Sequence, residues 1–376
     1  MRIGIDARFL GAGASSLGRY SENLLMALSR QDTETEYLVF VHASLERKLK
    51  VGDNFRLIPV RGYPLSMRGM MRMALRLYKE KLDLFHVHFP LVPLFVHCPM
   101  MVTVHDTLPF QARNLDFARR MRPMRWLQTR LLYPWSLRRA KWIVCVSWST
   151  RDQLCEYFPD LFHKSTVIHS GLSDAFRTPP ERATLDLIRS RLELPDHYIL
   201  YSGSARSDKN IESMVRAFAL LRQRRPDLHS LHFLLEIAGD YDLIPLIERM
   251  IRQFGLSRHM RVLRNMGNEE RRVLFEQARL LMLLSRHEGF GFPVLEAQVC
   301  GLPVIAAESG ALPEIAGEGA VLADPDNLEH LVLMIENVLS DQQLRDYLVK
   351  KGRANVQRFD WNKSADHFLQ MYRLLF

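Results

Sequence analysis

The sequence lacks clustered cysteines, long apolar runs and a signal peptide, which is typical of soluble globular proteins. Its four cysteines are widely scattered among 376 residues, with no C-x-x-C pair and no metal-ligand spacing. We therefore predict core thiols in a reducing cytoplasm and no metal site. No apolar run approaches the roughly 20 residues of a membrane-spanning helix. The first residues, MRIGIDARFLG, lack the charged start and apolar stretch of a signal peptide and are typical of a strand and a turn.

The composition is that of a large, basic globular protein. Hydrophobic residues make up 47% of the chain and charged residues 25%, with no internal repeat and no low-complexity tract. A length of 376 residues exceeds one ordinary core and suits two domains. The formal net charge of +9 favours an anionic partner. Charge alone leaves nucleotides, nucleic acid and acidic membrane surfaces open.

Short apolar segments alternate with helical patterns along the whole chain. The predicted strands cover residues 2–7, 37–42, 55–60, 84–89, 101–106, 142–147, 165–170, 198–203, 232–239, 261–265, 280–285, 303–307 and 320–324. Continuous apolar strands joined by helices indicate parallel sheets covered on both faces. We therefore predict an α/β protein of two doubly wound, Rossmann-like domains, residues 1–172 and 197–359, joined by a polar linker at 173–196.

A glycine loop and the start of a helix follow one of these strands. Residues 287–298, HEGFGFPVLEAQ, come after the predicted strand 280–285, and ligands of open α/β sheets bind beyond the carboxyl ends of the strands. Pro293 suits the first position of a helix. The amides of that helix, with the backbone of Gly289 and Gly291, would form a site for a phosphate or another anion.

Two carboxylates, eight positions apart, flank this loop. Glu296, one turn into the helix, could accept hydrogen bonds from ribose hydroxyls, as acids near nucleotide sites do. Glu288 would face the part of the ligand beyond the phosphates. In the alternative interpretation both acids only complement the helix N-terminus, and an isolated E-x7-E pattern would favour that alternative.

The surrounding sequence resembles a known family. Residues 285–317, SRHEGFGFPVLEAQVCGLPVIAAESGALPEIAG, are similar to the donor-site signature of the GT4 family of retaining glycosyltransferases. Residues 198–218, YILYSGSARSDKNIESMVRAF, are similar to the family's G-x-x-x-x-x-K-N-[IL] stretch. The segments IGIDARFL, LGRYSENLLMAL and VTVHDTLPF resemble members that transfer mannose and related sugars in bacterial polysaccharide synthesis. The resemblance spans nearly the whole chain and implies the GT-B fold, two Rossmann-like domains facing across a cleft.

The resemblance also implies roles for individual residues. Glu296 would bind the ribose of a nucleoside diphosphate sugar, Glu288 a hydroxyl of its hexose, and Lys209 the diphosphate as it leaves. The other implied donor-binding residues are Gly203, Asn210, Gly289, Phe290, Gly291 and Phe292. A fixed ammonium and a helix N-terminus can stabilise the charge of the leaving diphosphate, so we expect neither a metal nor a cofactor.

One position departs from the family pattern. Family members commonly place an Arg directly before this Lys or just after the Gly of the strand, where this chain has Asp208 and Ser204. Arg206 lies between them and is our candidate replacement. An exposed loop charge is the alternative interpretation of Arg206.

Histidines mark the ends of two strands in the first half. His105 and Asp106 end the strand 101–106, and the resemblance implies that such a His contacts the donor sugar in catalysis. A structural role for His105 is the alternative. His86 and His88 point to one face of their strand. A metal pair would need a third ligand, so we prefer a structural or minor acceptor-site role.

Two further motifs resemble known sites only superficially. The glycines of residues 11–20, GAGASSLGRY, lack the G-x-G-x-x-G spacing of a dinucleotide fingerprint. We expect instead a loop that approaches the acceptor or the donor phosphates, with Gly18 and Arg19 at the helix start. The D-x-D of residues 240–242 binds metal in a different glycosyltransferase fold, and we assign it no metal.

Basic amphipathic segments bear on the partner. Residues 67–81 place Arg68, Arg72, Arg76 and Lys79 in one helical stripe, flanked by methionines and other apolar side chains. This pattern suits a membrane interface, and residues 113–141 continue it. A core-packed helix with a solvated basic face is the alternative. The terminal helix, residues 360–376, is expected to pack back on the first domain, as in the GT-B fold.

We therefore predict a retaining, metal-independent glycosyltransferase in bacterial polysaccharide or lipopolysaccharide synthesis. It would move a hexose, with mannose the first choice, from a nucleotide sugar to a glycan or polyprenol-diphosphate-linked acceptor. It would work in the cytoplasm, at the anionic inner face of the plasma membrane. The alternatives are a GT-B-fold epimerase, which needs no acceptor, and a non-catalytic membrane or nucleic-acid binder. The second leaves the two acids and the lysine without a role, and buried strands argue against nucleic acid. The sequence leaves open the base (GDP, UDP or dTDP), the linkage and the oligomeric state.

Overall fold

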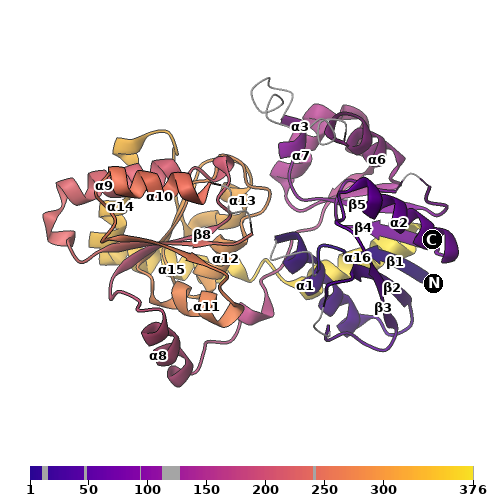
Figure 1. Cartoon of the computed structure of the whole chain (residues 1–376), viewed down its shortest axis with the longest axis horizontal. Coiled ribbons are helices and arrows are strands. Elements are labelled where there is room, and N and C mark those ends of the chain that lie inside the picture. Colours follow the sequence, from indigo (N-terminus) through magenta and orange to yellow (C-terminus); the bar gives the residue numbers. More distant parts are fainter. Residues whose placement is uncertain (11–15, 46–48, 94, 112–127, 240–242, 376) are drawn as a thin grey trace. The chain divides into compact units, whose positions relative to one another are not determined.

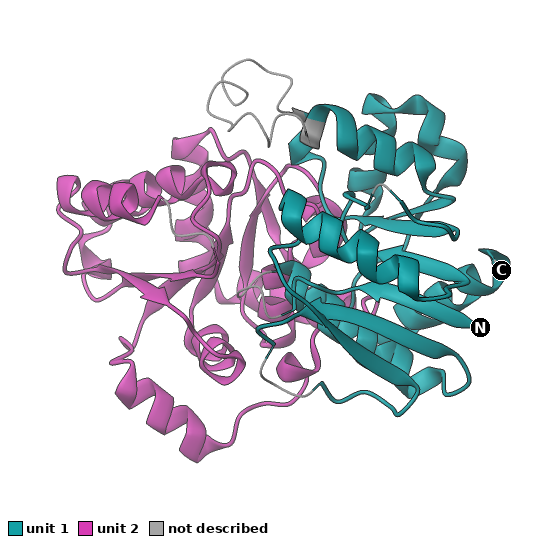
Figure 2. Cartoon of the chain, turned by 45° about the vertical axis from the view of Figure 1, so that its right-hand side comes forward, with its two compact units in different colours: residues 1–171, 360–376 teal, residues 172–359 magenta. Residues whose placement is uncertain are grey.

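The chain forms two compact units. The computed structural model describes residues 1–10, 16–45, 49–93, 95–111, 128–239 and 243–375. Unit 1 comprises residues 1–171 and 360–376, and unit 2 comprises residues 172–359 (Figure 2). The segment 173–196, predicted to be a linker, lies in unit 2 and includes helix α8 (Arg182–Arg191).

Unit 1 is built on a parallel sheet in the order β3-β2-β1-β4-β5-β6-β7. Its strands are β1 (Arg2–Asp6), β2 (Glu36–His42), β3 (Phe55–Val60), β4 (Leu84–Val87), β5 (Met100–Val104), β6 (Trp142–Cys145) and β7 (Ser165–Val167). All seven strands predicted for this half are present. Several end two or three residues early, because polar residues such as His88 and His105 already belong to the loops that follow.

Helices flank this sheet, including the last helix of the chain (Figure 1). They are α1 (Ser16–Gln31), α2 (Met67–Lys79), α3 (Leu108–Gln111), α6 (Tyr133–Arg139), α7 (Trp148–Tyr157) and α16 (Trp361–Leu375). Helix α16 packs on α1, where the Gln31 side chain donates to the carbonyl of Asn362 at 2.9 Å. The chain crosses itself tightly here. A Cβ atom on Gly171 would lie 2.2 Å from the backbone nitrogen of Trp361, so only glycine fits.

Unit 2 contains a second parallel sheet, in the order β10-β9-β8-β11-β12-β13. Its strands are β8 (Tyr198–Gly203), β9 (His232–Ile237), β10 (Met260–Arg264), β11 (Leu280–Leu283), β12 (Val304–Ala307) and β13 (Val321–Ala323). All six match predicted strands. The chain runs outward from β8 through β9 to β10 and returns to the other side of β8 with β11. The strand order therefore reverses between β8 and β11, which is where open α/β sheets bind ligands.

Helices cover both faces of this second sheet, α9, α10 and α14 on one and α11, α12 and α15 on the other (Figure 1). The helices after α8 are α9 (Ile211–Arg224), α10 (Ile244–Gln253), α11 (Asn268–Gln277), α12 (Phe292–Val299), α13 (Leu312–Ala316), α14 (Leu328–Ser340) and α15 (Gln342–Val356). Among the described helices of either unit, none is both long and apolar enough to cross a bilayer.

Candidate functional site

Lys209 and Glu288 meet at the point where the strand order of unit 2 reverses. Lys209 ends a short 3-10 turn after β8, and Glu288 lies in the loop after β11. The Lys209 ammonium is 2.8 Å from a carboxylate oxygen of Glu288 and 3.3 Å from the carbonyl of His287. The two side chains are only 11% and 19% exposed. The structure thus brings together two residues, 79 positions apart, that the sequence analysis assigned to one site.

Arg206 belongs to the same cluster through Asp208. Its guanidinium makes two hydrogen bonds to the Asp208 carboxylate, at 2.9 and 2.7 Å, and a carboxylate oxygen of Asp208 lies 3.5 Å from the Lys209 ammonium. Burial opposes ionisation of Asp208, but the hydrogen bonds from Arg206 and the charges of Lys209 and Arg206 outweigh it. The pKa of Asp208 is therefore lowered. Arg206 is thus not an isolated loop charge.

The path of the glycine loop is fixed by the neighbouring loop after β12. Gly291 caps α12 with φ of 96°, and a Cβ there would lie 2.8 Å from the Leu312 side chain. Gly310, with φ of 59°, lets the backbone of Glu288 approach, since a Cβ would lie 2.7 Å from its carbonyl oxygen. The amide of Ala311 donates to that same carbonyl at 2.9 Å. Helix α12 then begins at Phe292 with Pro293 in its first turn, as predicted.

The other loop residues with predicted donor contacts are tied into the protein. Phe290 is buried, and its ring lies 4.9 Å from that of Phe292. The main chain of Gly289, between Glu288 and Phe290, stays partly exposed. Gly203 ends β8, where a Cβ would lie 2.6 Å from the Tyr201 hydroxyl.

Asn210 adopts a left-handed conformation, with φ of 52°, directly after Lys209. Its side-chain amide donates to the carbonyl of Pro325 at 3.3 Å and accepts from the Ser213 hydroxyl at 2.9 Å. These contacts hold the turn that presents Lys209. Asn210 therefore acts on the site through the backbone it fixes.

Glu296 lies in a buried ionic network that the sequence analysis missed. Its carboxylate accepts a 2.6 Å hydrogen bond from Arg271, which also donates to the Ser202 hydroxyl at 3.2 Å. Ser202 in turn donates to Glu236 at 2.5 Å. Ser202 and Glu236 are paired across β8 and β9. The signal available in the sequence was a serine and a glutamate inside strands that are otherwise apolar.

In unit 1, the predicted residues lie at the carboxyl edge of the sheet. His105 follows β5, and burial is the main cause that lowers its pKa to about 3, so its imidazole is neutral at physiological pH. Its Nε2 atom is buried, with no hydrogen-bond partner among the residues that the structure describes. Asp106 accepts a hydrogen bond from the Leu108 amide at 3.2 Å. Gly18 and Arg19 lie in the first turn of α1, whereas residues 11–15 of the glycine-rich loop lie outside the described residues.

The H-x-H pair, with His86 in β4 and His88 directly after it, bridges the sheet to two helices. His86 is hydrogen-bonded to the Tyr372 hydroxyl of α16 at 2.7 Å and to Thr103 at 2.9 Å. His88 is hydrogen-bonded to Ser21 of α1 at 2.8 Å. Within the described part of the chain, no group of three potential ligands is arranged to hold a metal. The D-x-D of residues 240–242 lies outside that part. These contacts favour the structural role for His86 and His88.

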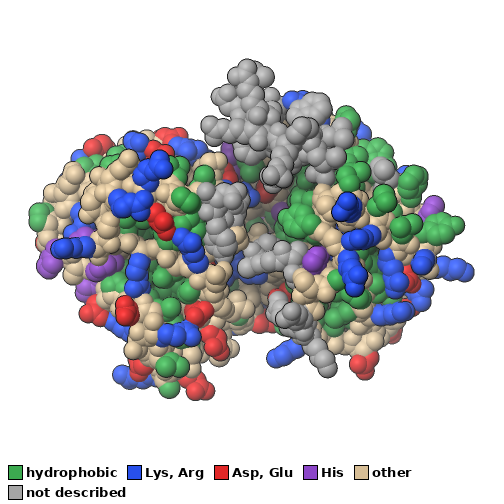
Figure 3. Space-filling model, viewed as in Figure 1, with side chains coloured by type: hydrophobic (Ala, Val, Ile, Leu, Met, Phe, Trp, Pro, Cys, Tyr) green, Lys and Arg blue, Asp and Glu red, His purple; other side chains and the backbone are tan. Residues whose placement is uncertain are grey.

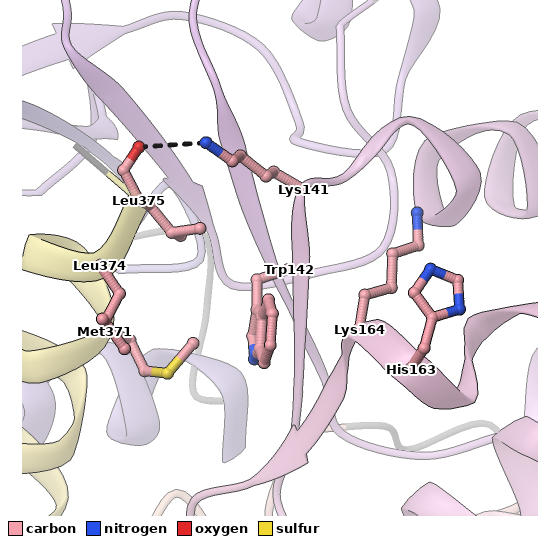
Figure 4. Close-up of a pocket in the computed structure, with 7 residues that line it drawn as sticks. All are labelled: Lys141, Trp142, His163, Lys164, Met371, Leu374 and Leu375. Atoms are coloured by element: carbon pink, nitrogen blue, oxygen red, sulfur yellow. Dashed lines mark hydrogen bonds between the residues drawn. The ribbon is translucent and has the colours of Figure 1, made fainter.

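A pocket of about 300 Å³ lies at the opposite edge of the sheet of unit 1, near the amino ends of β6 and β7 (Figure 4). Its lining comprises Lys141, Trp142, His163, Lys164, Met371, Leu374 and Leu375. Both lysines donate to backbone carbonyls, Lys164 to Arg138 and Ala140 and Lys141 to Leu375. The two lysines thus bind carbonyls at the carboxyl ends of helices α6 and α16. None of the predicted site residues lines this pocket.

Two family models match the two halves of the chain. Residues 17–176 match Glycosyltransferase Family 4, and residues 186–355 match Glycosyl transferases group 1. Each unit thus matches a glycosyltransferase family model over most of its length. The matched ranges include His105 in the first unit and the cluster around Lys209 and Glu288 in the second.

The chain is similar in sequence to proteins named as O-antigen chain mannosyltransferases. The chain is 29% identical over 247 residues to O-antigen chain mannosyltransferase B of Escherichia coli, covering 64% of this chain and 62% of that protein. It is 23% identical over 367 residues to O-antigen chain mannosyltransferase RfbU of Salmonella typhimurium strain LT2, covering 94% of each. The first alignment thus spans less than two thirds of the E. coli relative.

Solved structures establish the fold. Sucrose-phosphate synthase from Thermosynechococcus elongatus superposes with a TM-score of 0.80 at 19% identity, covering 100% of this chain and 99% of that one. Anabaena HepE in complex with UDP-glucose superposes with a TM-score of 0.75 at 16% identity, covering 99% and 100%. The chain has the GT-B fold, as the resemblance predicted.

Proposed function

We propose that this protein is a retaining glycosyltransferase of O-antigen-type polysaccharide synthesis. It moves a hexose, with mannose the first choice, from a nucleoside diphosphate sugar to a glycan or polyprenol-diphosphate-linked acceptor. The observation that carries the proposal is the pairing of Lys209 with Glu288 where the strand order reverses, beside the N-terminus of α12. The relatives named as mannosyltransferases support the choice of sugar.

The cluster suits the departure of a diphosphate. The Lys209 ammonium is largely buried against the Glu288 carboxylate. A bound diphosphate would replace Glu288 as the counter-ion of Lys209. Glu288 could then accept a hydrogen bond from a hexose hydroxyl. Arg206, held by Asp208, adds a second positive charge nearby. Charge that develops on the leaving group is thereby stabilised in a preorganised site. His105 would act as a neutral imidazole, because its pKa is lowered to about 3.

The first experiment identifies the donor. Thermal melting of the purified protein with GDP-mannose, UDP-glucose and dTDP-sugars should show one ligand that raises the melting temperature, because a ligand that binds the native state stabilises it. Transfer from that donor to a lipid-linked acceptor then tests the activity. An unchanged melting temperature with every nucleotide sugar, together with no transfer, would overturn the proposal.

We also propose that transfer needs no divalent cation. Lys209 and the start of α12 supply the positive charge that a metal provides elsewhere. Turnover in excess EDTA should therefore equal turnover in magnesium. Complete loss of activity in EDTA, restored by magnesium or manganese, would contradict the proposal and point to a metal at the D-x-D of residues 240–242.

The exposed face of α2 supports a position at an anionic membrane surface. Met70, Met73 and Leu77 are buried against the sheet. The opposite face exposes apolar side chains between basic ones: Met67, Arg68, Met71, Arg72, Leu75, Tyr78 and Lys79. Basic and hydrophobic side chains also share the visible face of unit 1 (Figure 3). Arg76, predicted in the same stripe, is half-buried and pairs with Glu80 at 3.4 Å. Residues 112–127 of the second basic segment lie outside the described residues.

Reversing three charges on this face should weaken vesicle binding. We expect Arg68→Glu, Arg72→Glu and Lys79→Glu together to lower the affinity for phosphatidylserine vesicles at least tenfold at low salt. Each basic residue near such a surface contributes about 1 kcal/mol, and salt screens the effect. Co-sedimentation at 50 and 500 mM salt measures it.

A matched control makes the same charge change elsewhere. Arg249→Glu, Arg252→Glu and Arg258→Glu alter exposed residues of unit 2 and should leave vesicle binding nearly unchanged. Equal losses in the two triple variants would show that net charge alone drives the binding. The basic stripe of α2 would then be a solvated face.

A further inference from the structure

Arg271 joins two buried carboxylates into one network. Its side chain is 5% exposed, and those of Glu236 and Glu296 are 1% and 3% exposed. One guanidinium nitrogen donates to the Glu296 carboxylate at 2.6 Å and to the Ser202 hydroxyl at 3.2 Å. The Nε atom lies 3.5 Å from Glu236. The network gathers residues from β8, β9, α11 and α12 beside the point where the strand order reverses.

The charge balance makes Arg271 the cation on which both acids depend. A buried carboxylate needs an opposite charge or several hydrogen-bond donors to remain ionised. Ser202 donates to Glu236, whereas Glu296 accepts a 2.6 Å hydrogen bond from Arg271. Without Arg271, Glu296 would lose the side chain that holds its carboxylate, and two acids would share this buried space without an opposite charge.

The position of Arg271 is fixed by aromatic rings. Its guanidinium carbon lies 5.5 Å from the centre of the Phe176 ring and 5.9 Å from that of Phe275. Arg271 sits in the first turn of α11, where its amide donates to the carbonyl of Gly267. Hydrogen bonds at its edge and aromatic rings near its face keep the Arg271 guanidinium in one position. Glu296 is therefore held where Arg271 places it.

Arg271 contacts the two oxygens of Glu296 unequally. One accepts the 2.6 Å bond from Arg271, and the other lies 3.5 Å from the second guanidinium nitrogen, at the limit of hydrogen bonding. A carboxylate offers about four acceptor positions, so Glu296 can bond to Arg271 and to a ligand together. With 3% of its side chain exposed, a ligand can reach only an edge of the carboxylate.

We infer that Arg271 is a positioning residue for donor binding: it holds the Glu296 carboxylate in place and directs it at a ribose hydroxyl. The inference rests on the proposed function. Arg271 itself does not touch the nucleotide. Its removal should therefore weaken recognition of the ribose and leave the contacts to the phosphates intact.

The test compares a ribonucleotide with an analogue that lacks both ribose hydroxyls. The probe is GDP or UDP, whichever stabilises the wild type more, and its 2′,3′-dideoxy form. Calorimetry gives the two dissociation constants for each variant. The wild type should prefer the ribonucleotide by roughly tenfold or more, the effect of losing a hydrogen bond to a charged group. Arg271→Met should reduce this ratio towards one, while its affinity for the dideoxy form stays that of the wild type.

The chain offers a matched control in the adjacent arginine. Arg272 is equally buried but bonds to the carbonyl of Phe176 and to Glu276. Arg272→Met should lower the melting temperature as much as Arg271→Met and keep the full preference for ribose. Glu296→Gln, which removes the charge directly, should lose the preference as Arg271→Met does.

The outcomes are distinct. If Arg271→Met does not fold, the double variant Glu236→Leu with Arg271→Met removes both buried charges of that pair and should fold without the ribose preference. A wild-type ratio in either Arg271 variant would overturn the inference and leave Arg271 a structural residue. Failure of the wild type to bind any nucleotide would instead contradict the proposed function.

Discussion

Unit 1 should lose about 4 kcal/mol of its free energy of unfolding between pH 7.5 and pH 5 through buried His88 and His105, with a further loss through buried His86. Burial lowers the pKa of His86 well below its ordinary value, and the charges of His88 and His105 add to this effect. Burial likewise lowers the pKa values of His88 and His105 to about 3. Their rings contact hydroxyl and aromatic groups of Ser21, Thr103, Tyr20 and Tyr372.

The direction follows from proton binding. In the unfolded chain each histidine binds a proton below about pH 6.5. In the folded unit His88 and His105 stay neutral down to about pH 3, and the pKa of His86 also lies well below its ordinary value. The unfolded state therefore binds more protons throughout this window, and stability falls as the pH falls. At pH 5 the loss is about 2 kcal/mol for each of His88 and His105. For a domain of ordinary stability, roughly 5–15 kcal/mol, the total approaches unfolding.

Tryptophan fluorescence isolates unit 1 in this measurement. All five tryptophans lie in residues 1–171 and 360–376, so urea unfolding followed at their emission reports on unit 1 alone. In His88→Asn, which cannot take up a proton at this position, the fall in stability between pH 7.5 and pH 5 should shrink by about 2 kcal/mol. An unfolding midpoint that stays constant from pH 7.5 to pH 5 would contradict the prediction.

Lys209→Met should lower kcat/KM for the nucleotide sugar about a hundredfold or more while the protein stays folded. Loss of one preorganised group that stabilises developing negative charge costs about two to three orders of magnitude in other enzymes. Methionine retains most of the length of the lysine side chain and removes the charge. Initial rates with the identified donor, together with the melting temperature, measure the effect.

Two further variants separate charge from packing. Lys209→Met also leaves Glu288 without its 2.8 Å partner, so Lys209→Met with Glu288→Gln tests whether the loss comes from an uncompensated carboxylate. Lys209→Arg keeps the positive charge and should retain more activity than Lys209→Met. Wild-type kinetics in Lys209→Met would remove Lys209 from the donor site.

The sequence predicted what depends on local pattern. All thirteen strands follow from apolar runs, and the start of α12 follows from a proline two positions after a glycine. Lys209 and Glu288 could be assigned to one site because the segments around them resemble the donor-site motifs of the GT4 family. The contacts of Arg271 could not be predicted from the sequence, because its partners Ser202 and Glu296 lie 69 and 25 positions away. No local periodicity encodes such pairs, and helix α8 was hidden because its polar sequence resembles a linker.

The crossing at Gly171 and Trp361 has a consequence for the order in which the protein is made. Unit 2 is inserted between the two segments of unit 1. During synthesis the first 171 residues leave the ribosome without α16, and with it the Tyr372 hydroxyl that bonds to His86. Unit 2 can complete its core before the last helix has been translated. Unit 1, whose synthesis begins first, is therefore completed last. Until α16 has been translated, the sheet of unit 1 lacks one of the helices that cover it.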